Sequence, residues 1–199
     1  IIGNFLGLSV CASDLLKNVS LITNIQVYST QITLTHLLDQ RLNMELLIFS
    51  GLQASGKSTF YQKNFATTHK LVSTDLMPNH KNRTKRQAQL IAQALESGHS
   101  VVVDNTNPTK EDRAILISIG KQYHAQISGY YFQSYVSRCL DRNQQRQGGG
   151  KVPALGIYAT SRKLERPVFQ EGFDQLFYVK FADDLDFVVS PCNEEFADG

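Results

Sequence analysis

Residues 51–58 read Gly-Leu-Gln-Ala-Ser-Gly-Lys-Ser, and this stretch decides the fold class of the chain. It satisfies the pattern G-x-x-x-x-G-K-[S/T] at every fixed position. Gly51 and Gly56 allow the backbone to turn sharply, so that several N–H groups can point at one polyphosphate. The helix that follows presents the positive end of its dipole to the same anion. The pattern therefore predicts a nucleoside triphosphate site.

The individual positions of the loop have distinct expected tasks. Lys57 can reach the β- and γ-phosphates, and the Ser58 hydroxyl can ligate Mg²⁺. ATP and Mg²⁺ are the cofactors expected here. The residues expected to bind the nucleotide are Gly51, Gln53, Ala54, Ser55, Gly56, Lys57, Ser58 and Thr59.

The surroundings of the loop have the order that the motif requires. Residues 44–50 form a short apolar run, as expected of a buried parallel strand, and residues 59–68 can continue as a helix. Further strands are expected at 70–74, 100–104, 125–132, 176–181 and 186–190, and further helices at 83–96, 108–123, 134–146 and 154–164. For the helix at 108–123 we expect Asn107 as N-cap and Pro108 as first residue. The alternation predicts an α/β fold, with a mainly parallel sheet between two layers of helices.

Composition limits the class of protein. The chain has 199 residues, a net charge of +2, 42% hydrophobic and 19% charged residues, which fits a globular protein. Cys11, Cys139 and Cys192 lie far apart and read as reduced thiols. No apolar run has the length of a membrane span, and residues 1–10 lack the basic residues of a secretory signal. A cytoplasmic protein without membrane contact is expected.

The composition changes at Met44. Residues 1–43 are rich in Ser, Thr and Asn and carry no motif, so we expect an N-terminal extension there and one domain at 44–199. The extension could be a folded hairpin or helix, or a segment added by a gene start placed upstream of Met44. We favour the second interpretation.

Two carboxylates follow predicted strands. At the carboxyl end of a parallel strand, Asp75 could accept the proton of a hydroxyl that attacks the γ-phosphate. A helix N-cap is the alternative for this residue. Asp104 ends the strand at 100–104, which is the Walker B position, where a carboxylate holds Mg²⁺. A strand-end Asx turn is the alternative. Asn105 and Asn107 follow as candidates for hydrogen bonding to substrate.

Basic residues gather in two further segments. Arg138, Arg142 and Arg146 have the spacing of one helix face and precede Gly148-Gly149-Gly150. A mobile lid that closes on phosphates, with Arg142 and Arg146 acting in catalysis, would explain both features, and a solvated basic face is the alternative. The second segment, Lys81 to Arg86, could bind an anionic acceptor through Arg83 and Arg86, or be a solvated helix start.

Residues 44 to about 181 resemble the kinase domain of the polynucleotide 5′-hydroxyl kinases, within the adenylate-kinase-like P-loop group classed with the AAA-type ATPases. The resemblance rests on 51–59, on Ser73-Thr74-Asp75, on Val103-Asp104-Asn105-Thr106-Asn107-Pro108 and on 142–153; the later Arg166-Pro167 and Glu171-Gly172-Phe173 are similar too. It implies ATP and Mg²⁺, a base at Asp75, and a lid at Arg142 and Arg146.

Two departures from the family affect the acceptor. The family often has an arginine three residues after the base, where this chain has Pro78, so Arg83 or Arg86 would have to substitute. The Asp-x-Asp-Gly-Thr sequence of the companion 3′-phosphatase does not occur in the chain. The expected function is transfer of the γ-phosphate of ATP to a polynucleotide 5′-hydroxyl. The alternatives are a toxin-like kinase of small metabolites or nucleotide sugars, and an ATP-binding regulatory module without kinase activity.

Overall fold

The computed structural model describes residues 44–146, 150–182 and 186–192. Its sheet has six strands in the order β2-β3-β1-β4-β5-β6. The strands are β1 (Glu45–Ser50), β2 (Lys70–Val72), β3 (Val101–Asp104), β4 (Gln126–Phe132), β5 (Gln175–Phe181) and β6 (Phe187–Pro191). The first five pair in parallel, and β6 pairs with β5 in antiparallel orientation. The predicted α/β class with a mainly parallel sheet is therefore confirmed.

Helices cover both faces of this sheet. The α-helices are α2 (Lys57–Asn64), α3 (Arg83–Glu96), α4 (Lys110–Gln122), α5 (Val136–Gln144) and α6 (Ala154–Ser161), with short 3₁₀ turns η1 (Thr74–Leu76) and η3 (Phe169–Glu171). In β1, Leu46 and Ile48 pack with residues of α3 and α4. Their neighbours Leu47 and Phe49 pack with residues of α2. Successive side chains of β1 thus point into the two cores on opposite faces of the sheet, so the domain has three layers: helices, sheet and helices.

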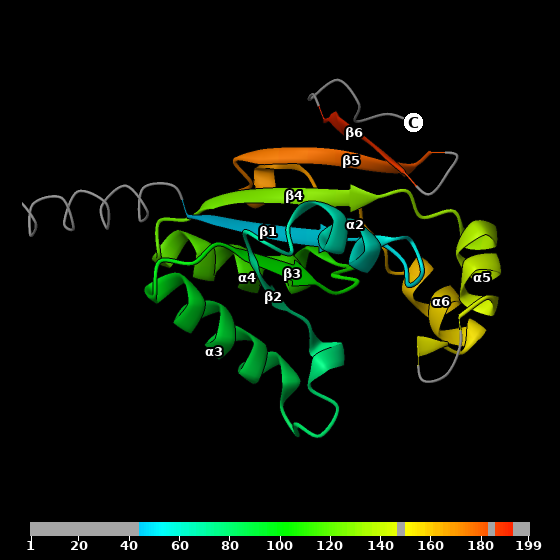
Figure 1. Cartoon of the computed structure of the whole chain (residues 1–199), viewed down its shortest axis with the longest axis horizontal. Coiled ribbons are helices and arrows are strands. Elements are labelled where there is room, and N and C mark those ends of the chain that lie inside the picture. The colour runs from blue at the N-terminus through cyan, green and yellow to red at the C-terminus, as the bar shows by residue number, and fades with distance from the viewer. Residues whose placement is uncertain (1–43, 147–149, 183–185, 193–199) are drawn as a thin grey trace, which may run out of the picture. The chain divides into compact units, whose positions relative to one another are not determined.

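A third, smaller core holds α5 and α6 beside the loop after β1. It consists of the fully buried Leu52, Cys139 and Ile157, one residue each from the loop, α5 and α6. In Figure 1, β1 and β4 point their carboxyl ends towards α5 and α6. Every polar side chain that follows a parallel strand is therefore brought to this end of the domain.

Several predicted boundaries need correction. The helix expected at 108–123 begins at Lys110 and is capped by Thr109, which forms a capping box with Asp112, so Asn107 is not its N-cap. Asn107 has φ 38°, a left-handed conformation outside the extended region usual for an N-cap. The helix after the loop ends at Asn64 instead of 68, and the one expected at 134–146 is α5, which ends at Gln144.

Other expectations lie outside the described residues. These are the nature of residues 1–43 and the freedom of Gly148 and Gly149. Within the described part of the chain, no helix combines the length and the apolar character that crossing a membrane would need.

Candidate active site

The loop at 51–58 has the backbone geometry that a phosphate-binding loop needs. Gly51 has φ 147° and Gly56 has φ 101°, and Ala54 between them also has a positive φ of 59°. The Gly51 N–H donates to the carbonyl of Thr106 over 3.0 Å, which ties the loop to the segment after β3. A Cβ at Gly56 would collide with the ring of Phe181, so the position has room for glycine alone.

Lys57 is the buried cation of this loop. Its ammonium donates to the carbonyls of Gly51 at 3.1 Å and Leu52 at 2.6 Å, and to the Ser55 hydroxyl at 3.3 Å. Burial lowers the pKa of Lys57 to about 8, although the nearby charges of Asp104 and Asp75 act in the opposite direction. The ammonium is thus held inside the loop, where it can meet a phosphate at neutral pH.

Ser58 and Asp104 lie side by side, as a magnesium site requires. The Ser58 hydroxyl donates to Oδ2 of Asp104 over 2.6 Å. Burial raises the pKa of Asp104, and the hydrogen bond from Ser58 and the charge of Lys57 act in the opposite direction. A hydroxyl and a carboxylate at this distance are hard oxygen donors of the kind Mg²⁺ prefers, so both residues fit the expected metal.

Asp75 lies in η1, just beyond β2, with an exposed side chain. The turn is fixed from β3: Oδ1 of Asn105 accepts hydrogen bonds from the Thr74 N–H and hydroxyl, both at 2.9 Å, and from the Ser73 hydroxyl at 3.3 Å. The charge of Asp75 acts on both Lys57 and Asp104. The N-cap of η1 is Ser73, so the capping alternative does not apply to Asp75.

Asn105 and Asn107 therefore have structural partners. Asn105 holds the turn of Asp75 as described. Asn107 is buried, and its amide donates to the carbonyl of Phe49 in β1 over 2.7 Å, while its own carbonyl accepts from Ser50 Oγ. Both residues also line a cavity beside the site, so contact with a substrate stays a prediction for each of them.

One pair at the site was missed by the sequence reasoning. Arg113 of α4 is fully buried and forms a two-bond ion pair with Glu171, with both distances 2.7 Å. The same guanidinium donates to the carbonyls of Asn107, Pro108 and Glu165. Arg113 therefore holds the segment after β3 in place through its carbonyl groups. The sequence does hold a signal for this buried pair. Arg113 lies three positions before Leu116, so a charged residue falls on the apolar face of α4.

The predicted lid arginines are separated in the structure. Arg142, in the last turn of α5, donates from Nε to the carbonyl of Ala54 over 2.7 Å and lies 4.9 Å from the ring of Phe181. Arg146 lies beyond the end of α5 and donates to the carbonyl of Gly150, while Arg138 packs over Tyr135. The expected single helical face of three arginines is therefore wrong for Arg146, because the helix ends first.

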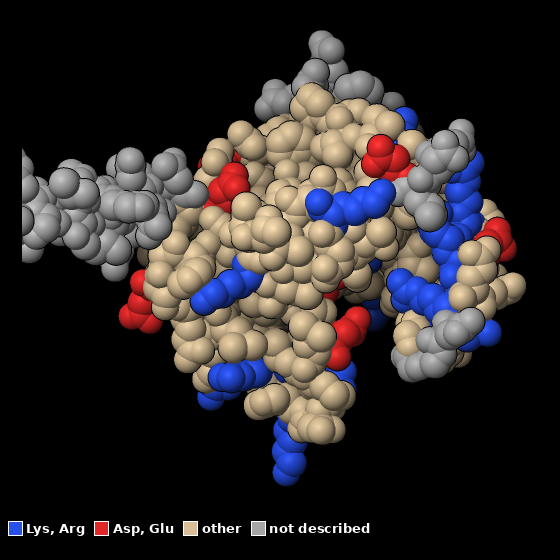
Figure 2. Space-filling view, viewed as in Figure 1, with Lys and Arg blue, Asp and Glu red and all other residues tan. Residues whose placement is uncertain are grey.

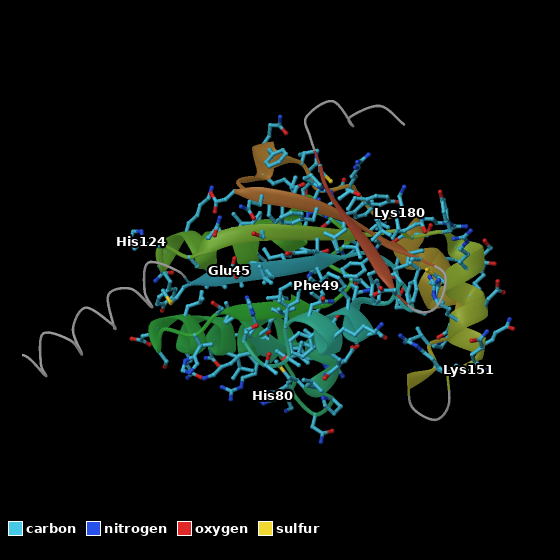
Figure 3. All side chains as sticks on the ribbon, turned by 45° about the horizontal axis from the view of Figure 1, so that its top comes forward. Glu45, Phe49, His80, His124, Lys151 and Lys180 are labelled. Carbon is cyan, nitrogen blue, oxygen red and sulfur yellow. The ribbon has the colours of Figure 1, made fainter. Side chains whose placement is uncertain are left out.

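Positive charge nevertheless gathers at this end of the domain. Figure 2 shows Lys and Arg side chains over α5 and α6, across a hollow from the body of the domain. In Figure 3, Lys151 lies at the same end, whereas His124 lies at the opposite end of the sheet. The charge of Arg146 acts on Lys57 and Asp104, so the exposed arginine is near the loop.

The remaining residues lie around the acceptor side of the site and the loop. Arg83, exposed at the start of α3, donates to the backbone carbonyl of Pro78, the residue that stands where the resemblance led us to expect an arginine. Arg86 is half-buried one turn later. Gln53 turns towards α6 and donates to Thr160 over 2.9 Å, and Thr59 is exposed at the start of α2.

The domain is similar to known kinases in sequence and in fold. A bifunctional polynucleotide phosphatase/kinase of Schizosaccharomyces pombe is 28% identical over 149 residues, which are 70% of this chain and 34% of that protein. The chain thus spans about a third of that relative. A fungal RNA kinase crystal structure superposes with TM-score 0.57 at 14% identity over 71% of this chain and 39% of that one. A gluconokinase from Sinorhizobium meliloti 1021 gives TM-score 0.54 at 18% identity, with coverages of 72% and 86%.

The family assignment rests on a profile match that covers more than half of the chain. The profile of the family described as AAA domain matches residues 46–167, which contain the loop at 51–58, Asp75, Asp104 and both Arg142 and Arg146. This segment is more than half of the chain, and it runs from β1 to just beyond α6. The chain therefore belongs to the AAA domain family and is a P-loop kinase.

Proposed function

We propose that this kinase transfers the γ-phosphate of ATP to the 5′-hydroxyl of a polynucleotide. The observation that carries the proposal is Asp75, an exposed carboxylate on a turn anchored to β3, close enough for its charge to act on Lys57 and Asp104. A hydroxyl placed beside Asp75 would also lie next to the donor phosphates. The polynucleotide kinase relative and the basic start of α3 support a nucleic acid as the acceptor.

In the proposed reaction the hydroxyl oxygen bonds to the γ-phosphorus as the bond from that phosphorus to the bridging oxygen breaks. ADP leaves, and the proton of the hydroxyl passes to the Asp75 carboxylate. Lys57, Arg142 and Arg146 offset the negative charge of the transferred group. Ser58 and Asp104 would hold Mg²⁺, which would supply further positive charge to offset the negative charge of the phosphates. The cytoplasmic location expected from the cysteines belongs to the same proposal.

The test is transfer of labelled γ-phosphate from ATP to 5′-hydroxyl oligonucleotides, nucleosides and sugars. Asp75→Asn keeps the shape of the side chain, so we expect ATP affinity to stay close to that of the wild type while turnover falls by about 10² to 10⁴. Glu96→Gln serves as control, because it also replaces a carboxylate by an amide, at an exposed residue at the far end of α3. Unchanged turnover in Asp75→Asn would show that Asp75 is not the general base of the reaction.

A second function, phosphorylation of a small hydroxyl compound, is favoured by one observation. A cavity of about 300 Å³ lies beside η1 and the segment after β3, and its lining contains no Lys or Arg. Labelling of sugars without labelling of oligonucleotides would support this second function. ATP binding without transfer to any acceptor of the panel would contradict both.

A further inference from the structure

The cavity beside Asp75 contains an unpaired buried amide. The cavity has a volume of about 300 Å³ and is lined by residues of η1, α3, the segment after β3 and α4. Gln87, on the buried face of α3, is 6% exposed and lines it. Among the described residues, nothing accepts a hydrogen bond from its Nε2. A buried donor without an acceptor is costly, so its retention here suggests that a bound molecule supplies the acceptor.

The chemistry of the lining selects a neutral ligand. Hydroxyls and amides line one part, from Thr74, Thr84, Gln87 and Asn105. The single charged residue of the lining is Asp112, whose carboxylate accepts hydrogen bonds from the N–H and the hydroxyl of Thr109. A phosphate would meet no cation inside this cavity and would be better placed over the exposed basic residues of 81–86 outside it.

The other part of the lining is apolar. It includes Ile115, a large side chain of α4 that is 48% exposed, together with Leu116 and Pro108. A lining that combines apolar side chains with amide groups matches a nucleobase, which has apolar faces and a polar edge, better than a sugar, which has hydroxyls on every side. The volume is at the lower end of the range for ligand sites, about 300 to 1,000 Å³, so it suits one base and not several.

Resting on the proposed function, we propose that this cavity binds the base of the 5′-terminal nucleoside and that Gln87 determines its selection. Nε2 of Gln87 donates to a carbonyl oxygen or ring nitrogen on the edge of the base. The sugar of the same nucleoside then places its 5′-hydroxyl at Asp75, which follows the lining residue Thr74 in η1. The phosphates of the strand lie over the basic start of α3.

The test compares two oligonucleotides with the same sequence, one with an intact and one with an abasic 5′-terminal nucleotide. Wild-type protein should show a KM about tenfold or more lower for the intact strand, as expected for one hydrogen bond to a buried donor. Gln87→Leu should reduce this difference about tenfold, to the part that the apolar side chains of the lining contribute, without raising the KM for ATP. Gln89→Leu, an exposed glutamine of the same helix, should retain it. A difference that is undiminished in Gln87→Leu, or a raised KM for ATP, overturns the inference.

A binding experiment separates this inference from the proposed function. Nucleosides alone are titrated into the full chain and followed by calorimetry. If oligonucleotides are not phosphorylated, the polynucleotide acceptor is wrong, but nucleoside binding that Gln87→Leu loses and Gln89→Leu keeps still supports the base site. The absence of nucleoside binding to the wild type overturns it. Gln87→Leu should unfold at a temperature no lower than the wild type, because it removes a buried donor that has no acceptor.

Discussion

Replacing Glu171 by Gln should weaken the whole domain. Glu171 accepts two hydrogen bonds of 2.7 Å from Arg113, which is fully buried, and its own side chain is 7% exposed. Glutamine has nearly the same shape but carries no charge and turns one acceptor into a donor. Arg113 would then remain as a buried cation facing an N–H₂ group.

The loss of one partner from a buried ion pair costs about 3 to 5 kcal/mol of the free energy of unfolding, because the other charge stays desolvated. For a domain of this size, that corresponds to a fall of about 6 to 20 °C in the midpoint of thermal unfolding. The measurement is thermal and urea unfolding of the full chain, followed by circular dichroism. Glu165→Gln is the control, because that carboxylate is exposed and accepts from the backbone N–H of Lys110 instead of from a buried cation. If the two variants unfold at the same temperature, the pair does not stabilise the domain and the reasoning is refuted.

The other predictions concern the loop and the arginines. The pKa of Lys57 is about 8 in the free protein and should rise when the phosphates of ATP bind. The affinity for ATP should therefore fall above pH 8, by up to about tenfold per pH unit. Binding titrations should show no such fall in Lys57→Arg, because arginine stays charged in this range. Gly56→Ala should weaken ATP binding and lower the unfolding midpoint more than Gly98→Ala, because both have a positive φ but only the first lacks room for a methyl group; equal effects would contradict this. Arg146→Ala should lower turnover more than ATP affinity, with partial rescue by Arg146→Lys; weaker oligonucleotide binding at full turnover would instead make Arg146 an acceptor contact.

The parts of the fold that depend on local pattern could be predicted from the sequence. The loop at 51–58 requires glycine at two fixed positions, and the strands around it are continuous apolar runs, because both of their faces are buried. The ends of α3 coincide with the predicted range, since Asn82 caps its first turn and Gly98 follows shortly after its end. These signals need no knowledge of distant contacts.

The parts that depend on distant contacts could not be predicted. Asn107 looked like an N-cap, but its amide is held by the carbonyl of Phe49 and its carbonyl by Arg113, residues that only the folded sheet brings together. Arg146 continued the spacing of four, but α5 ends at Gln144. Asn105 likewise positions Asp75 through Ser73 and Thr74, which lie 32 and 31 residues earlier in the chain, in the turn after β2.

The hydrogen bonds of Asn105 have a consequence for redesign. They attach the turn of Asp75 to the end of β3, inside the sheet, so the position of that carboxylate does not rest on β2 alone, a three-residue strand at the edge of the sheet where local fraying is easiest. The segment between the turn and the start of α3 can therefore be exchanged as a cassette, as long as Ser73, Thr74, Asn105 and the core residue Met77 are kept. A new acceptor preference could then be grafted onto the chain without rebuilding the machinery that handles the donor.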